Sequence, residues 1–184
     1  MGSHQRDRQL LREAEGYLDL ALSDVGGELP LPMRIQLAGR CLHALDLLSD
    51  KMAQRVHAVM LRGHALKISE RFEEAIACFE TAAKIDEENI HIFLALAWCQ
   101  KRCGRLDLAI RAMEEGILVD PTEAILFYNL ACYWALTGNV AQTVVYLGRA
   151  LELDSAMRDL IPAESDFDLV RDATEFQALT TVIV

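Results

Sequence analysis

The sequence has no long apolar run and no excess of basic residues. Nowhere in its 184 residues is there a stretch of about eighteen uncharged apolar residues, which a membrane-spanning helix needs. The first residues, MGSHQRDRQLLRE, become charged too early for a secretory signal. The formal net charge of −10 argues against a nucleic-acid partner, because phosphate binding requires a basic face. We therefore expect a soluble, cytoplasmic protein that binds neither nucleic acid nor a membrane.

Sequence motifs of reactive and metal-binding sites are missing as well. There is no phosphate-binding glycine loop, dinucleotide-binding turn or paired histidine motif of a zinc protease. The five cysteines are odd in number and lack the spacing of a disulfide framework, so we expect buried free thiols in a reducing compartment. Cys99 and Cys103 share a helical face, but no second pair accompanies them, which favours packing over metal binding. We expect no enzyme, no catalytic residue, no metal and no cofactor.

The sequence does contain an internal repeat of thirty-four residues. Small and large apolar positions return at this interval, in phase, from Ala75 and Phe79 onward. The repeated positions are the small residues Gly63, Ala97 and Ala131, the small residues Ala75, Ala109 and Thr143, the large residues Phe79, Met113 and Leu147, and the terminal aspartates Asp86, Asp120 and Asp154. Because helix pairs of this length cannot bury both faces alone, we expect neighbouring pairs to stack.

Each repeated unit is predicted to contain two helices. The apolar spacing inside a unit is helical. The breaks between helices fall at Ser69–Arg71, Gly104 and Gly138, where glycine allows a left-handed turn. Small residues on the first helix are expected to face small residues on the second, so that the two helices approach closely. The predicted units are Val56–Asn89, Ile90–Glu123 and Ala124–Met157.

These residues resemble the tetratricopeptide repeat (TPR) family, whose thirty-four-residue helix pairs carry small residues at the eighth and twentieth places and a proline near the end. The closest matches are WCQKRCGRLDLAIRAMEEGILVDP and FYNLACYWALTGNVAQTVVYLGRALELD. The resemblance covers about 56–157 and implies an all-α right-handed superhelix of antiparallel helix pairs, an α-α solenoid. The chain departs from the family pattern at Arg62, Thr143, Glu87 and Ser155.

Residues 1–55 are predicted to form an N-terminal helical hairpin. Counting back thirty-four from Ala75 and Phe79 gives Cys41 and Leu45, which indicates a divergent second helix. Its partner is predicted at Arg8–Leu22, and Ser23–Pro32 is a glycine- and proline-rich link longer than the later turns. Because of this long link the pair is not a standard repeat. It is a cap, a stretched fourth repeat or a dimerisation hairpin.

Residues 158–184 are predicted to form C-terminal capping helices and a tail. The pieces DFDLVRD and EFQAL resemble the short helical tail that often follows the last repeat in bacterial TPR proteins. A terminal repeat needs a cover for its apolar face. The residues expected to provide it are Leu160, Ile161, Phe167, Leu169, Val170, Phe176 and Leu179. The final Thr180–Val184 is uncharged and β-prone, so it is either packed on the body or a sticky end.

In TPR proteins the first helices line a concave groove that usually holds a peptide or a partner's helix. Carrying the family's groove positions onto this chain gives His57, Met60, His64, Lys67, His91, Leu94, Trp98, Lys101, Arg102, Ile125, Tyr128, Asn129 and Cys132. This lining is apolar and aromatic with a basic edge, on an otherwise acidic protein, which favours an acidic-hydrophobic peptide. In the alternative interpretation, Trp98 and Tyr128 pack between repeats, and Lys101 and Arg102 only stabilise the end of their helix.

The resemblance implies a non-catalytic adaptor or scaffold that binds a protein or peptide. Some co-chaperone members of the family clamp a carboxylate with lysine, asparagine and arginine. The matching places here hold Met60, His64, Ala95, Ile125 and Asn129, so that function is rejected. Two alternatives stay open: a secretion-type chaperone that keeps a client soluble, and a structural subunit that assembles into homo-oligomers.

Overall fold

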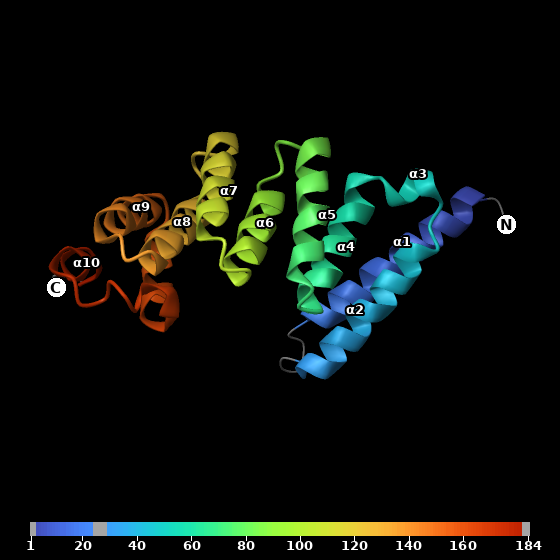
Figure 1. The fold of residues 1–184 in the computed structure, drawn as a ribbon, viewed down its shortest axis with the longest axis horizontal. Helices are drawn as coiled ribbons and strands as arrows, with labels where there is room; N and C mark the ends of the chain where they lie inside the picture. Colours follow the sequence, from blue (N-terminus) through green and yellow to red (C-terminus); the bar gives the residue numbers. More distant parts are fainter. Residues whose placement is uncertain (1–2, 24–28, 182–184) are drawn as a thin grey trace. The chain divides into compact units, whose positions relative to one another are not determined.

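The protein is all-α in the computed structural model, which describes residues 3–23 and 29–181 (Figure 1). Within these ranges the regular elements are α-helices and short 3₁₀ helices, and no strand occurs. No helix in the described ranges combines the length and the apolar character that a bilayer crossing demands. The chain divides into two compact units, Met1–Glu88 and Asn89–Val184, and each is described by itself.

The first unit begins with the expected helical hairpin. Helix α1 (Ser3–Leu22) packs along α2 (Leu31–Asp46), and the two lie side by side in Figure 1. Pro32 occupies the first turn of α2, where its missing N–H has no intrahelical partner to lose. Cys41 and Leu45 are buried in the hairpin core. The predicted link Ser23–Pro32 falls partly outside the described residues.

A short helix, α3 (Asp50–Ala53), is fixed to α1 by one buried carboxylate. Asp7 on α1 is only 4% exposed, and its side chain accepts hydrogen bonds from the backbone N–H of Ser49 at 3.1 Å and from the Ser49 hydroxyl at 2.7 Å. Ser49 is the N-cap residue of α3, so a carboxylate forty-two residues away satisfies a donor at the start of that helix. These hydrogen bonds lower the pKa of Asp7.

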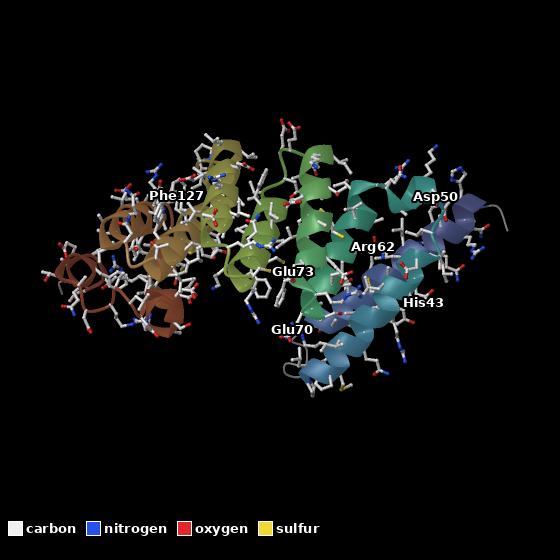
Figure 2. The ribbon with its side chains drawn as sticks, in the orientation of Figure 1. His43, Asp50, Arg62, Glu70, Glu73 and Phe127 are labelled. Atoms are coloured by element: carbon white, nitrogen blue, oxygen red, sulfur yellow. The ribbon has the colours of Figure 1, made fainter. Side chains whose placement is uncertain are left out.

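Helices α4 (Val56–Ile68) and α5 (Phe72–Ile85) complete the first unit, and α4 packs against the hairpin. Gly63 on α4 lies so close to α5 that a β-carbon there would be 2.7 Å from Cε1 of Phe79. Arg62 (labelled in Figure 2) lies at a place where TPR repeats usually carry leucine, and it forms an ion pair with Asp46 of α2 at 2.8 Å. The departure from the family pattern at Arg62 therefore has a partner in the hairpin.

The second unit contains α6 (Ile90–Arg102), α7 (Leu106–Val119), α8 (Ala124–Leu136) and α9 (Val140–Leu153). The first helices α4, α6 and α8 begin at Val56, Ile90 and Ala124, the predicted starts of the three units. The small residues Ala97, Ala109, Ala131 and Thr143 are all fully buried, as expected for close helix contact.

The turns between paired helices have the predicted left-handed conformation. The φ angles are 71° at Gly104 and 74° at Gly138, and Glu70 has φ 57° at the same place of the preceding pair. The aspartates that end a unit cap the next turn: Asp120 accepts from the backbone N–H of Thr122, and Asp154 accepts from that of Ala156, both at 2.9 Å. Asp120 and Asp154 therefore mark the end of a helix pair for a local reason.

The C-terminal segment begins with 3₁₀ rather than α-helices. It comprises η1 (Ser155–Ala163), η2 (Ser165–Phe167) and α10 (Thr174–Thr180). Of the predicted covering residues, Ile161, Phe167, Val170 and Phe176 are buried, Leu179 is half-buried, and Leu160 and Leu169 are exposed. The prediction was therefore wrong for Leu160 and Leu169. Thr180 ends α10, and residues 182–184 of the predicted sticky end lie outside the described residues.

Candidate functional site

The first unit contributes four of the predicted groove residues, all on α4. His57 is exposed, and Met60, His64 and Lys67 are half-buried. The imidazole of His57 contacts the Glu15 carboxylate of α1 at 2.5 Å, and the ring of His64 meets Phe79 edge-on at 5.1 Å between centroids. His57 is therefore engaged by a carboxylate of the hairpin, and His64 by an aromatic ring of α5.

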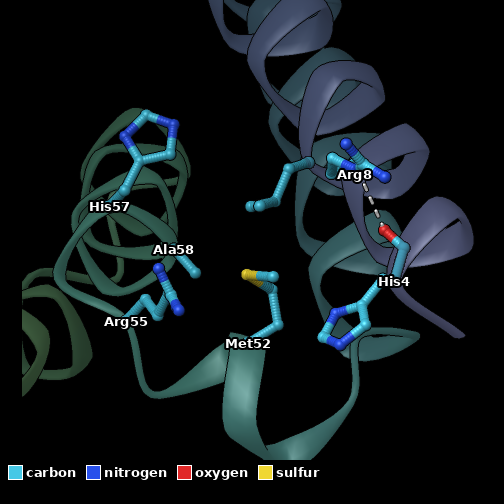
Figure 3. Close-up of a pocket in the computed structure, with 7 residues that line it drawn as sticks. His4, Arg8, Met52, Arg55, His57 and Ala58 are labelled. Atoms are coloured by element: carbon cyan, nitrogen blue, oxygen red, sulfur yellow. Dashed lines mark hydrogen bonds between the residues drawn. The ribbon is translucent and has the colours of Figure 1, made fainter.

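A basic pocket lies beside His57 in the same unit (Figure 3). It has a volume of about 510 Å³ and an apolar floor that includes Leu11 and Met52. His4, Arg8 and Arg55 stand around this floor together with His57, and the Arg8 guanidinium donates to the backbone carbonyl of His4 at 3.3 Å. Four groups that carry or can accept positive charge are thus gathered on a protein with a net charge of −10.

Helix α6 of the second unit carries five predicted groove residues. His91 and Arg102 are exposed, whereas Leu94, Trp98 and Lys101 are half-buried. The guanidinium carbon of Arg102 lies 5.2 Å from the centroid of the Trp98 ring, within the range of a cation–π contact. Trp98 and Arg102 therefore form one amphipathic surface, apolar with a cationic edge.

Helix α8 carries the last four predicted groove residues, and two of them are not open to solvent. Ile125 and Asn129 are half-buried, and the Asn129 amide donates to the carbonyl of Ile125 at 2.9 Å. Tyr128 and Cys132 are only 3% and 2% exposed. For these two the expectation of an open groove is corrected, because the chain's own C-terminal segment lies over this face of α8.

The covering segment makes one ionic and one aromatic contact with predicted groove residues. The Lys101 ammonium donates to the Asp166 carboxylate at 2.5 Å, across sixty-five residues of sequence. Phe167, the next residue, is fully buried and meets the Tyr128 ring edge-on, with centroids 5.7 Å apart and an interplanar angle of 86°. Phe167 also meets the ring of Phe176 on α10, with centroids 5.3 Å apart. An acidic residue followed by an aromatic residue thus occupies part of the predicted binding face.

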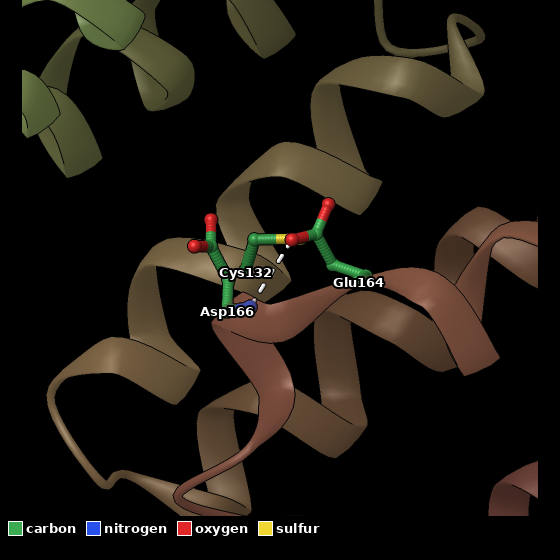
Figure 4. A group of neighbouring side chains, drawn as sticks. All are labelled: Cys132, Glu164 and Asp166. Atoms are coloured by element: carbon green, nitrogen blue, oxygen red, sulfur yellow. Dashed lines mark hydrogen bonds between the residues drawn. The ribbon is translucent and has the colours of Figure 1, made fainter.

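Cys132, Glu164 and Asp166 form the one group among the described residues whose side-chain atoms could jointly ligate a metal, with ligand atoms within 4.8 Å of one another (Figure 4). Both carboxylates already have partners. Asp166 binds Lys101, and Glu164 accepts the backbone N–H of Asp166 at 3.1 Å. The arrangement is explained by capping and ion pairing, and it gives no independent indication of a bound cation.

Burial has a strong effect on the ionisable groups beneath this segment. It raises the pKa values of Tyr128, Cys132 and Tyr133, and the carboxylates of Glu164 and Asp166 add to the shift. The Tyr128 hydroxyl is buried without a hydrogen-bond partner among the described residues. At neutral pH the Cys132 thiol is therefore protonated, which is the unreactive form.

Sequence reasoning missed Glu164, Asp166, Phe167 and Tyr133 as members of this site. Phe167 was expected only as a cover for apolar surface. The ammonium of Lys101 also lies 5.9 Å from the centroid of the Tyr133 ring. The signal in the sequence was the DFD piece itself, which contains charge beside an aromatic residue, but its spacing could not indicate which helix it would meet.

Residues 67–131 match the family model of the tetratricopeptide repeat. This part of the chain carries tetratricopeptide repeats. The match covers about a third of the chain and includes α5, α6 and α7 together with parts of α4 and α8. The TPR assignment agrees with the thirty-four-residue spacing of α4, α6 and α8.

Solved structures with a similar fold are themselves TPR proteins. MamA matches with a TM-score of 0.64 and 18% identity, covering 83% of this chain and 80% of that chain. An RS-1 MamA double mutant matches with a TM-score of 0.61 and 12% identity, covering 91% and 94%. The Yersinia enterocolitica type III secretion chaperone SycD, in complex with a peptide of the translocator YopD, matches with a TM-score of 0.55 and 21% identity, covering 73% and 95%. No curated protein matches the chain significantly. At these identities the likeness shows the TPR fold alone.

Proposed function

We propose that this TPR chain is a non-catalytic adaptor that binds an acidic-hydrophobic segment of another protein. The observation that carries the proposal is the amphipathic face of α6, where exposed His91 and Arg102 border the half-buried Leu94 and Trp98. TPR scaffolds are typically non-catalytic, and a rigid helical face suits the binding of a peptide or helix. Fold alone does not fix function, so the proposal rests on these side chains.

Electrostatics favours an acidic partner. The protein as a whole has a net charge of −10, so an acidic peptide approaching at random is repelled. At α6 the side chains of His91 and Arg102 provide a local basic edge, and the Arg102 guanidinium is held over the Trp98 ring. A carboxylate that meets Arg102 can be bound while an apolar neighbour covers Trp98. This pairing of charges gives specificity and a salt-dependent association rate.

The test is a peptide array that tiles acidic-hydrophobic sequences and is probed with the purified chain. The variant W98A/R102A should lose at least tenfold in affinity for the peptides that the wild type retains, because it removes the aromatic surface and the cation together. Affinities are measured by fluorescence polarisation, and circular dichroism checks that helix content is unchanged.

A matched control uses an exposed apolar residue on another face. Leu118 on α7 is 85% exposed and lies in a second helix rather than a first helix. L118A removes apolar surface as W98A does, but it should leave peptide affinity unchanged. Equal losses in both variants would contradict adaptor function at α6.

A second candidate is a secretion-type chaperone. It is favoured by the similarity to SycD, whose structure contains a translocator peptide and covers 73% of this chain. A chaperone should raise the soluble yield of an aggregation-prone client on co-expression, and the increase should disappear with W98A/R102A. An adaptor binds a partner that is already soluble, so its presence should leave the partner's yield unchanged.

A further inference from the structure

The segment that covers α8 meets residues predicted for peptide binding on two helices. It brings Asp166 to Lys101 of α6 and Phe167 to Tyr128 of α8. A cover for exposed apolar surface needs apolar contacts only. The ion pair at 2.5 Å, with both side chains largely buried, adds a directional polar contact to the aromatic one. An ion pair beside an aromatic contact is a combination by which proteins also bind peptide ligands.

We infer that Lys101, Tyr128 and Cys132 form a docking site for a partner peptide in which an acidic residue is directly followed by an aromatic residue, and that Asp166 and Phe167 occupy this site as a built-in competitor. The inference rests on the proposed peptide-binding function and names the chemistry of the partner. The carboxylate binds the ammonium of Lys101, and the aromatic ring packs edge-on against Tyr128.

The segment is built in a way that permits displacement. Nine residues of η1 form a 3₁₀ helix that contains Pro162, although 3₁₀ runs longer than about four residues are uncommon because their hydrogen bonds have poorer geometry. Around the Asp166–Phe167 pair, Ser165, Asp168 and Leu169 are exposed. Residues 161–173 are held by the buried Ile161, Phe167 and Val170 and by Arg171, which donates to the carbonyls of Ile161 and Glu164. Displacement by a peptide therefore requires a local opening that releases these contacts together.

The fit between the segment and α8 is also incomplete. The Tyr128 hydroxyl is buried with no hydrogen-bond partner among the described residues. A buried polar group without a partner costs about 1–3 kcal/mol. A peptide that places a carbonyl or carboxylate oxygen at this hydroxyl would satisfy it and would gain an advantage over the resident segment. The partner is therefore expected to carry an acceptor near its aromatic residue.

The experiment uses the full chain and a fluorescein-labelled peptide of residues 161–173, IPAESDFDLVRDA. The variant D166N/F167A should release the site and bind this peptide at least tenfold more tightly than the wild type. The reason is that a segment docked about nine-tenths of the time lowers the apparent affinity for a competitor about tenfold. Adding K101E to the released variant should abolish the gain.

A matched control lies two residues along the chain. D168N/L169A changes the same kinds of residue at exposed positions, and it should bind the peptide as weakly as the wild type does. A peptide with alanine in place of the phenylalanine should bind neither variant. If D166N/F167A binds no more tightly than D168N/L169A while both stay helical, the inference is overturned.

Hydrogen exchange of the unmodified wild type gives a test that does not depend on a variant folding. The amides of 164–170 should exchange at least tenfold faster than those in the middle of α8. Exchange as slow as that of α8 would make the segment a permanent part of the core and would overturn the inference. Peptide-dependent formation of dimers would instead indicate that a second copy supplies the segment, and would overturn the choice of an external partner.

The two proposals fail in different ways. If the peptide of residues 161–173 does not bind but the array still retains peptides through Trp98 and Arg102, only this inference fails. If neither the wild type nor D166N/F167A retains any peptide of the array, the adaptor function itself is wrong.

Discussion

Gly63 is small because the residue that it faces is large. Its α-carbon lies so near Phe79 that an added β-carbon would be 2.7 Å from Cε1 and 2.8 Å from Cζ of the ring. In the second unit the positions that correspond to Gly63 and Phe79 hold Ala97 and Met113. In the third unit they hold Ala131 and Leu147. Of these three pairs, the one that contains phenylalanine is the one that contains glycine. The repeat therefore conserves the combined size of the two side chains.

We predict that G63A destabilises the first unit. Overpacking a core costs about 1–3 kcal/mol, and the gain from replacing a helical glycine by alanine, about 1 kcal/mol, offsets part of this. The expected net loss is up to about 2 kcal/mol in the free energy of urea unfolding. F79L should restore part of it, because the double variant reproduces the smaller Ala–Leu combination of Ala131 and Leu147.

Gly39 provides the control for this prediction. It lies exposed on α2, and an added β-carbon would meet nothing within 4 Å. G39A should therefore stabilise the protein by up to about 1 kcal/mol through helix propensity alone. If G63A is as favourable as G39A, the close contact with Phe79 is not a constraint on the fold.

Asp7 makes the stability of the first unit depend on pH. Hydrogen bonds from Ser49 lower its pKa below the ordinary value of 3.8, so the folded state favours the carboxylate. The stabilisation is present above the unfolded-state pKa and is lost as pH falls through the lower folded-state pKa. D7A should reduce the urea midpoint at pH 7 and flatten the decline of stability in acid below pH 4. The exposed Asp19 on the same helix provides the control D19A, which should leave the midpoint at pH 7 nearly unchanged.

At the scale of elements, the turns between paired helices obey one rule with one exception. Gly104 and Gly138 have positive φ angles, and Glu70 adopts the same conformation at 57° without being glycine. A left-handed residue with a side chain costs roughly 1–2 kcal/mol. A glycine loses more conformational freedom on folding than other residues do. This entropy loss lowers the stability gained from a glycine at the left-handed position by about 0.5–1 kcal/mol.

We therefore predict opposite signs for one substitution at two neighbouring sites. E70G should stabilise the protein by about 0.5–1 kcal/mol, because it relieves the left-handed turn. E73G, on the exposed face of α5 only three residues away (Figure 2), should destabilise it by about 1 kcal/mol. Thermal unfolding of both variants measures the difference. A loss of stability in both would show that the contacts of Glu70 outweigh its backbone strain.

The sequence predicted these elements well because their causes are local. The left-handed turns at Gly104 and Gly138 and the helix starts at Val56, Ile90 and Ala124 follow from the repeat. It failed where a contact joins distant residues. The Asp7–Ser49 hydrogen bonds span forty-two residues, and no periodicity connects their two ends.

The candidate site was predicted in part for the same reason. Among the family positions, Trp98 and Arg102 contact each other on α6, and the binding of a peptide by this surface stays a prediction. The family positions could not show that Tyr128 and Cys132 would be covered, because Lys101 and Asp166 are sixty-five residues apart. The exposure of Leu169, two residues after the buried Phe167, also depends on which side of the turn that follows η2 meets the body of the unit.

At the scale of the whole chain, the reactivity of the three buried cysteines can be measured separately for the two units. Cys41 belongs to the hairpin of the first unit, and Cys99 and Cys132 belong to the second. Burial raises the pKa of Cys41 to about 11, and burial together with Glu164 and Asp166 raises that of Cys132. Because only the thiolate reacts, both thiols should be modified slowly at pH 8 while the protein is folded.

Releasing the C-terminal segment should change one of these thiols only. In D166N/F167A, Cys132 loses its cover and the nearby Asp166 carboxylate. Its pKa should then fall toward the ordinary value, and its thiolate fraction at pH 8 should rise. We expect labelling by a maleimide, located by mass spectrometry of peptides, to become at least tenfold faster at Cys132 and to stay unchanged at Cys41. Faster labelling at both sites would indicate general unfolding, and unchanged labelling at Cys132 would mean that Asp166 and Phe167 do not hold the segment on α8.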